Sequence, residues 1–182
     1  FKGAPWPYKD LTAEVILYAG YSIFGLGVFA ILKALVVLSI AACFYLVMRP
    51  DRVHFPIYIL LCGLAISAVQ YRFTERPILF TLALFPLHIA LLEKLRLALS
   101  RNDNRSAAAA VAPTVVLFLW TLLHREAIVG IVFTFMYIVA FWTALLPGIS
   151  RITPFVGPPP NRRALVITTG ILLSIVPLSL LN

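Results

Sequence analysis

Long blocks of apolar residues are the feature that most constrains how this chain can fold. The run from Leu11 to Met48 is nearly twice as long as one membrane span of about 20 residues requires. Similar blocks follow to the end of the chain, and short segments between them hold most of the charges. Hydrophobic residues make up 62% of the chain and charged residues 12%, against roughly 45–50% and about 25% in soluble domains. The pattern predicts an all-α integral membrane protein.

The apolar blocks predict about six transmembrane helices, preceded by one shorter helix. Glycines at 20, 25 and 27 interrupt the first run, so residues 11–24 are expected to form an interfacial or re-entrant helix. The spans are expected at residues 26–48, 53–70, 77–92, 107–123, 127–146 and 164–181. Residues 1–182 then form a single polytopic membrane domain, in which 1–25 are the outer loop and the interfacial helix. Because the chain starts within a loop and stops at the edge of a span, both ends are expected to be incomplete.

Arginine and lysine are divided unequally between alternate loops, and this division predicts the orientation. One set of loops holds nine basic residues: Arg49, Arg52, Lys94, Arg96, Arg101, Arg105, Arg151, Arg162 and Arg163. The other set holds five: Lys2, Lys9, Arg72, Arg76 and Arg125. Since cytoplasmic loops carry the excess of positive residues, the second set is expected on the non-cytoplasmic face. Residues 6–14, 71–77 and 124–126 therefore share that face.

Several function classes are disfavoured by the composition. The net charge is +8, but it is spread over the loops instead of forming one basic block, so nucleic acid is not an expected partner. Cys43 and Cys62 lie inside apolar runs and are expected to be small buried side chains, with neither a disulfide nor a metal role. Glycine-loop, His-Glu-x-x-His and Gly-x-Ser-x-Gly motifs are absent from the sequence.

The loop at residues 71–77 carries three charges in seven residues, from Arg72, Glu75 and Arg76. Charge at a membrane surface is costly unless it is paired or hydrated. One interpretation is an interfacial turn with a local Glu–Arg ion pair. The other is an anion-binding corner that holds a phosphate or a sugar phosphate. The loop alone leaves both open.

Two further places hold candidate chemistry. Asp10 and Glu14 are one helical turn apart, so they could supply a general base or bind a divalent cation, or they could only cap the helix and offset its dipole. Trp120 and His124 share a helix face and are followed by Arg125. That group could stack a sugar ring and bind an anion, although an ordinary interfacial aromatic belt explains it almost as well. His88, within a span, is expected to be neutral and bonded to a neighbouring helix.

Three stretches of the chain resemble the polytopic glycosyltransferases of the GT-C superfamily that use polyprenyl-phosphate sugars. They are residues 10–18 leading into Phe24-Gly25-Leu26-Gly27, then Phe73-Thr74-Glu75-Arg76-Pro77 before a span that ends at Glu93-Lys94, and Trp120-x-x-x-His124 with Gly130 beyond. Together they cover most of the chain, and the resemblance implies the same sidedness as the charges do. Leu122 and Arg125 replace the Asn and Gly of the third pattern. The catalytic acid of these enzymes follows their first span, which here would lie before Phe1.

The resemblance implies an inverting transfer of a sugar from a polyprenyl-phosphate donor at the non-cytoplasmic face of a bacterial cytoplasmic membrane. It implies acidic groups at Asp10 and Glu14, and substrate-binding groups at Arg72, Arg76, Trp120, His124 and Arg125. No cofactor is expected beyond, at most, a divalent cation. The alternative is a non-catalytic transmembrane subunit of a larger complex, whose partners are other membrane subunits and the lipid bilayer. Whether the chain is an enzyme stays open at this point.

Overall fold

The computed structural model describes residues 11–48, 54–70, 77–101, 106–146 and 161–174, and every regular element in them is an α-helix. In chain order these are α1 (Leu11–Phe24), α2 (Gly27–Met48), α3 (Phe55–Gln70), α4 (Ile78–Ser100), α5 (Ser106–Leu123), α6 (Ala127–Thr143) and α7 (Arg162–Leu173). The expectation of an all-helical chain is confirmed for these residues. Two of the helices, α2 and α4, are long and apolar enough to cross a membrane.

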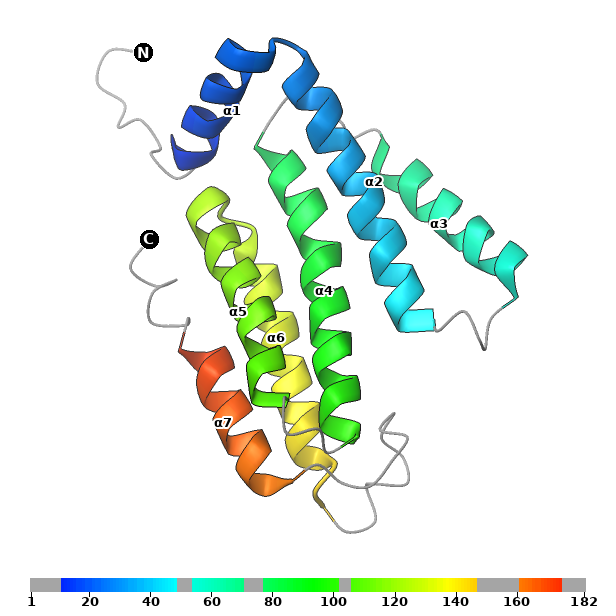
Figure 1. The fold of residues 1–182 in the computed structure, drawn as a ribbon, viewed down its shortest axis with the longest axis vertical. Coiled ribbons are helices and arrows are strands. Elements are labelled where there is room, and N and C mark those ends of the chain that lie inside the picture. Colours follow the sequence, from blue (N-terminus) through cyan, green and yellow to red (C-terminus); the bar gives the residue numbers. More distant parts are fainter. Residues whose placement is uncertain (1–10, 49–53, 71–76, 102–105, 147–160, 175–182) are drawn as a thin grey trace.

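Helix α4 lies at the centre of the bundle (Figure 1). It packs most extensively against α2 and α5, and it also contacts α6. Helix α3 lies outside α2, and α7 packs against α5. Because α4, α5 and α6 alternate in direction, the bundle has two ends. We call them the His124 end, where α4 begins and α5 ends, and the Arg96 end, where α4 ends and α5 begins.

The break between α1 and α2 falls at Gly25. This residue has a φ of 56°, in the left-handed region, and its N–H donates to the carbonyl of Tyr21 at 2.8 Å. Such a residue ends a helix at little steric cost when it is glycine. The short first helix expected from the sequence is therefore confirmed. Leu17 of α1 packs with Leu32 and Leu79, which places α1 at the His124 end.

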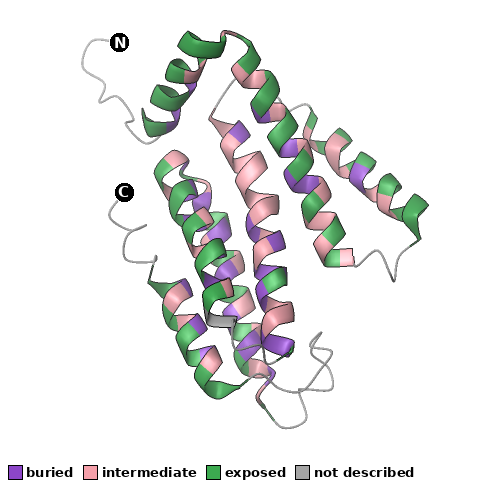
Figure 2. Ribbon diagram, in the orientation of Figure 1, coloured by how far each residue is buried: buried purple, intermediate pink, exposed green. Residues whose placement is uncertain are grey.

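Buried side chains gather along α4 and its neighbours, as Figure 2 shows. Toward the Arg96 end, Leu92, Leu95 and Leu99 of α4 belong to one cluster with Phe141 of α6 and Leu165 of α7. The outward faces of the helices are apolar as well, and α2 alone exposes Ile31, Leu35 and Leu38. In this bundle the buried and the exposed faces of the helices are therefore both apolar, and they differ mainly in how closely they pack.

Helix α4 is longer than the sequence predicts. It continues to Ser100 instead of ending at Leu92. The charged residues after Leu92 do not end the helix, because Glu93 and Arg96 are one turn apart and form an ion pair on it. Leu95 and Leu99 then add two fully buried side chains to the core. Residues 175–182, in which the last predicted span ends, lie outside the described residues.

Candidate functional site

Thr81, Trp120 and His124 come together at the His124 end of the bundle. Thr81 lies in the first turn of α4, Trp120 in the last turn of α5, and His124 directly after α5. Trp120 Nε1 donates to Thr81 Oγ1 at 3.0 Å, and the same oxygen lies 3.2 Å from His124 Nδ1. We call these three residues the Thr81 cluster. It connects α4 to the turn between α5 and α6.

The hydrogen-bond roles within the Thr81 cluster follow from one backbone donor. The N–H of Glu126 lies 3.3 Å from His124 Nδ1 and can only donate, so Nδ1 accepts in the neutral imidazole. Thr81 then donates its hydroxyl proton to Nδ1, while its oxygen accepts the indole N–H of Trp120. We therefore assign the proton of neutral His124 to Nε2. The network fixes the orientation of the imidazole ring.

Burial and charge differ sharply among the residues of this turn. His124 is only 8% exposed, whereas Arg125 is exposed and the Glu126 side chain is about half exposed. Glu126 Oε2 lies 3.9 Å from His124 Nδ1. This carboxylate therefore places a negative charge beside the imidazole ring. Arg125 adds a positive charge at the rim.

Trp120 is fully buried in the structure. Its ring lies 6.0 Å from that of Phe85 between centroids, and a Cβ added at Gly130 would come within 2.5 Å of Trp120 Cζ3. The indole is thus a packed support that holds Thr81 through its N–H. Stacking of Trp120 on a sugar ring stays a prediction. In this arrangement Trp120 acts on a ligand indirectly, because its N–H holds Thr81, which in turn contacts His124.

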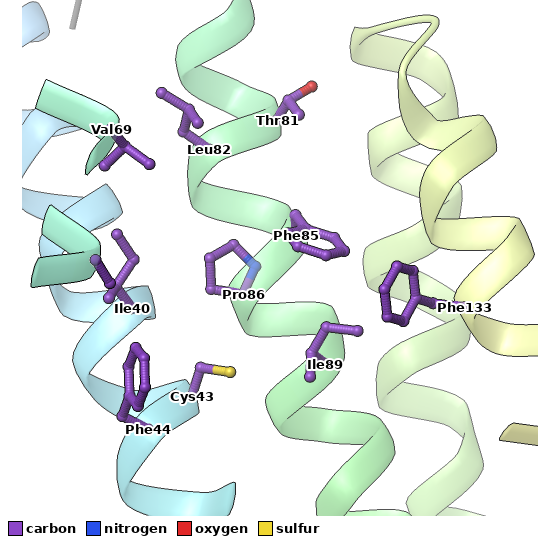
Figure 3. A pocket seen from close by; sticks show the side chains of 11 residues that line it. Ile40, Cys43, Phe44, Val69, Thr81, Leu82, Phe85, Pro86, Ile89 and Phe133 are labelled. Atoms are coloured by element: carbon purple, nitrogen blue, oxygen red, sulfur yellow. The ribbon is translucent and has the colours of Figure 1, made fainter. Parts of the chain in front are cut away.

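An apolar cavity of about 360 Å³ opens beside the Thr81 cluster (Figure 3). Its walls are Ile40, Cys43 and Phe44 of α2, Ala65 and Val69 of α3, Thr81, Leu82, Phe85, Pro86 and Ile89 of α4, and Phe133 of α6. Thr81 belongs to both the cavity and the polar cluster. A ligand with an apolar chain and a polar head could therefore place the chain in the cavity and the head at the cluster.

The other predicted site residues are only partly placed. Asp10, Arg72 and Arg76 lie outside the described residues. Glu14 is exposed on α1, which also contacts α5, so it lies at the His124 end. Within the described part of the chain, no three His, Cys, Asp or Glu side chains form a group that could hold a metal ion. The divalent cation stays a prediction.

His88 forms a second polar contact, deep in the bundle. It is fully buried, with Nδ1 3.2 Å from the carbonyl of Pro113 in α5 and Nε2 2.8 Å from Thr134 Oγ1 in α6. The carbonyl of Pro113 can only accept, so it takes a proton from Nδ1. Thr134 Oγ1 also donates to the carbonyl of Gly130 at 2.9 Å, so its single hydroxyl proton is shared between that carbonyl and Nε2. The prediction of a hydrogen-bonded histidine is confirmed, and the partners lie on two helices instead of one.

Two features of the structure were not predicted from the sequence. Thr81 carries no spacing signal, because a lone hydroxyl in an apolar helix commonly bonds to its own backbone. The Glu93–Arg96 ion pair does carry a signal, since an acidic residue three positions before an arginine meets it on a helix face. The orientation argument counts Arg96 only as a positive charge. Its partner shows that it has a structural role as well.

A scan against protein-family models and searches of curated proteins and of solved structures gave no match to this chain. The class is therefore defined by the fold and the site themselves. In the described residues it is a helical bundle with two candidate membrane-spanning helices, and with a hydrogen-bonded Thr–Trp–His cluster beside an apolar cavity.

Proposed function

We propose that the chain is an integral membrane protein in which six helices, α2 to α7, cross the bilayer and α1 lies at the non-cytoplasmic interface. The length of α2 and α4 supports this proposal, and so does the apolar outward surface. Exposed leucine, isoleucine and phenylalanine side chains match hydrocarbon, whereas in water they would be a costly surface. The excess of basic residues at the Arg96 end supports a cytoplasmic location for that end, and the resemblance described above is the ground for proposing a bacterial membrane.

We further propose that the protein transfers a sugar from a polyprenyl-phosphate donor to an acceptor at the His124 end. The observation that carries this proposal is the position of Thr81, which lines the apolar cavity and bonds to Trp120 and His124. The cavity offers an apolar wall for the prenyl chain. The Thr81 cluster at its edge offers polar groups to the phosphate and the sugar, which are attached to the end of that chain. The resemblance described above supplies the reaction class.

The chemistry follows that of an inverting transfer. The acceptor oxygen attacks the anomeric carbon of the sugar, and the bond from that carbon to the phosphate oxygen breaks. Polyprenyl phosphate leaves, and a carboxylate takes the acceptor proton. Asp10 or Glu14 is the candidate base. Arg72 and Arg76 stabilise the leaving phosphate, because a guanidinium can bind two of its oxygens at once.

A pair of variants on α3 tests whether the cavity holds the donor chain. Ala65 lines the cavity, whereas Ala68, three residues further along, is exposed and is not among the lining residues. In proteoliposomes supplied with radiolabelled polyprenyl-phosphate sugar, Ala65→Phe should lower both donor binding and transfer, and Ala68→Phe should leave both unchanged. Arg76→Ala should abolish transfer with the protein still inserted. Equal transfer by all of these variants and the unaltered protein would rule out the proposal.

One observation favours the alternative of a non-catalytic subunit. Gly63 and Ser67 are exposed one helical turn apart on α3, and a Cβ added at Gly63 would meet nothing within 4 Å. Small residues at this spacing allow a neighbouring membrane helix to approach closely. Purification in mild detergent distinguishes the subunit from the transferase by the proteins that co-purify with it. A subunit would keep companions in a fixed ratio and lose them in Gly63→Leu, whereas the transferase would act without companions.

A further inference from the structure

A second cavity, of about 440 Å³, lies further along α4, toward the Arg96 end. Its walls include Val47 of α2, Glu93 and Arg96 of α4, and Phe133, Met136 and Tyr137 of α6. Phe133 also lines the first cavity, so the two lie next to each other along α4. The proposed sugar transfer uses only the first cavity. The second combines mostly apolar walls with an ion pair.

The ion pair in this cavity is bidentate and largely buried. Arg96 Nε donates to Glu93 Oε2 at 2.7 Å, and Nη2 donates to Oε1, so the carboxylate is held by both prongs of the guanidinium. The side chains are 15% and 8% exposed, respectively. Removing two charges from water costs free energy that the pair only partly returns. Glu93 instead keeps Arg96 against the cavity wall, where a long arginine side chain would otherwise extend toward water.

The end of the bundle at which this cavity lies carries a net positive charge. The Arg96 end carries the described basic residues Lys94, Arg96, Arg101, Arg162 and Arg163, against Glu93 as the acidic residue among them. Basic sites between membrane helices at the cytoplasmic side attract anionic head groups. The walls at Val47, Phe133 and Met136 match a hydrocarbon chain.

We propose that this cavity binds an anionic phospholipid of the leaflet at the Arg96 end. The lipid phosphate lies at Arg96, which Glu93 positions, and the first part of an acyl chain lies against Phe133 and Met136. The net positive charge of the Arg96 end and the combination of an arginine with apolar walls carry the assignment. The site depends on the proposed membrane insertion but not on the proposed sugar transfer, so either can fail without the other.

The test measures lipid-dependent thermal stability of the full chain in detergent micelles. The melting temperature is followed by circular dichroism while dioleoyl phosphatidylglycerol or dioleoyl phosphatidylcholine is added. A lipid that binds only the folded state raises the melting temperature, and the rise grows with the logarithm of the lipid concentration once this exceeds the dissociation constant. Both lipids carry the phosphate, but the choline ammonium makes phosphatidylcholine neutral overall, whereas phosphatidylglycerol keeps a net negative charge beside Arg96. We therefore expect phosphatidylglycerol to bind the protein about tenfold more tightly, a difference of about 1.4 kcal/mol. Glycerol 3-phosphate, which has no chains, should give no shift.

Two matched pairs of variants locate the lipid. Arg96→Gln should remove the preference for phosphatidylglycerol, and Arg163→Gln, an exposed position at the same end, should retain it. Val47→Trp should fill the cavity and weaken binding, whereas Val139→Trp, at a residue of similar exposure outside the cavity, should not; Val47 is 46% exposed and Val139 44%. If Arg96→Gln fails to fold, the Val47 pair decides alone. Equal binding of the two lipids, an equal shift from glycerol 3-phosphate, or unchanged binding in Val47→Trp would overturn the proposal.

Discussion

Two buried threonines illustrate what a single polar atom does inside this bundle. Thr134 Oγ1 lies 2.9 Å from the carbonyl of Gly130 and 2.8 Å from His88 Nε2. Thr168 in α7 is fully buried too, but within the described part of the chain its hydroxyl has no hydrogen-bond partner. A buried hydroxyl without a partner loses its hydration and gains nothing in return. The two residues should therefore respond to the same substitution with opposite signs.

Replacing each of these threonines with valine keeps its shape and removes its hydroxyl. Thr168→Val should raise the free energy of unfolding by about 1 kcal/mol, since it removes an unpaired group. Thr134→Val should lower it by about 1–2 kcal/mol, because it leaves His88 without one of its partners. Unfolding by denaturant in mixed micelles measures both. A loss of stability in Thr168→Val would mean that its hydroxyl is satisfied.

The Thr81 hydroxyl is a third residue whose removal has a definite expected result. Thr81→Val leaves the indole N–H of Trp120 without its partner and removes one of the contacts that orient the imidazole of His124. We expect donor binding to weaken by about tenfold, the effect of losing one such polar contact. Thr121→Val is the control, because the Thr121 hydroxyl bonds only within its own helix, to the carbonyl of Phe118 at 2.8 Å. Donor binding that is unchanged in Thr81→Val would remove the cluster from the site.

At the scale of helices, the contact between α5 and α6 depends on Gly130. A Cβ there would lie 2.5 Å from Trp120 Cζ3 and 2.8 Å from Leu117 Cδ1. Gly130→Ala should lower the free energy of unfolding by about 1–3 kcal/mol, the cost of overpacking a tight interface. Gly170→Ala on α7 is the matched control, since a Cβ there meets nothing within 4 Å. That change should stabilise the protein by about 0.5–1 kcal/mol, because alanine is the better helix former. Equal responses of the two variants would contradict the packing described here.

The helices themselves could be predicted far better than the site. Apolar block length and glycine breaks locate α1 and the start of α2 to within a residue, because these signals act along the chain. The end of α4 was beyond such signals, since it depends on Leu95 and Leu99 reaching a core built by α6 and α7. The Thr81 cluster depends on residues 39 and 43 positions apart, and no local spacing indicates such a pair.

At the scale of the whole molecule, α4 connects two chemically different ends. Thr81 and Arg96 lie fifteen residues apart on one helix, which places them roughly 22 Å apart along its axis. The hydrocarbon core of a bilayer is about 30 Å thick, so both groups lie near opposite boundaries of the apolar region. In the proposed membrane orientation, the head groups of the two proposed ligands therefore belong to different leaflets, and their chains approach each other only at Phe133, which lines both cavities.

This arrangement requires the His124 end and the Arg96 end to face opposite sides of the membrane. The expected orientation places Arg125 outside and Arg163 in the cytoplasm. In a Cys43→Ala, Cys62→Ala background, a membrane-impermeant maleimide should label Arg125→Cys in intact cells, and Arg163→Cys only after permeabilisation. The two positions lie at opposite ends of the bundle, so each is the control for the other. Reversed labelling would invert the orientation and place the proposed transfer in the cytoplasm. Labelling of both from one side would contradict the six-span topology, because α6 separates the two positions by one crossing.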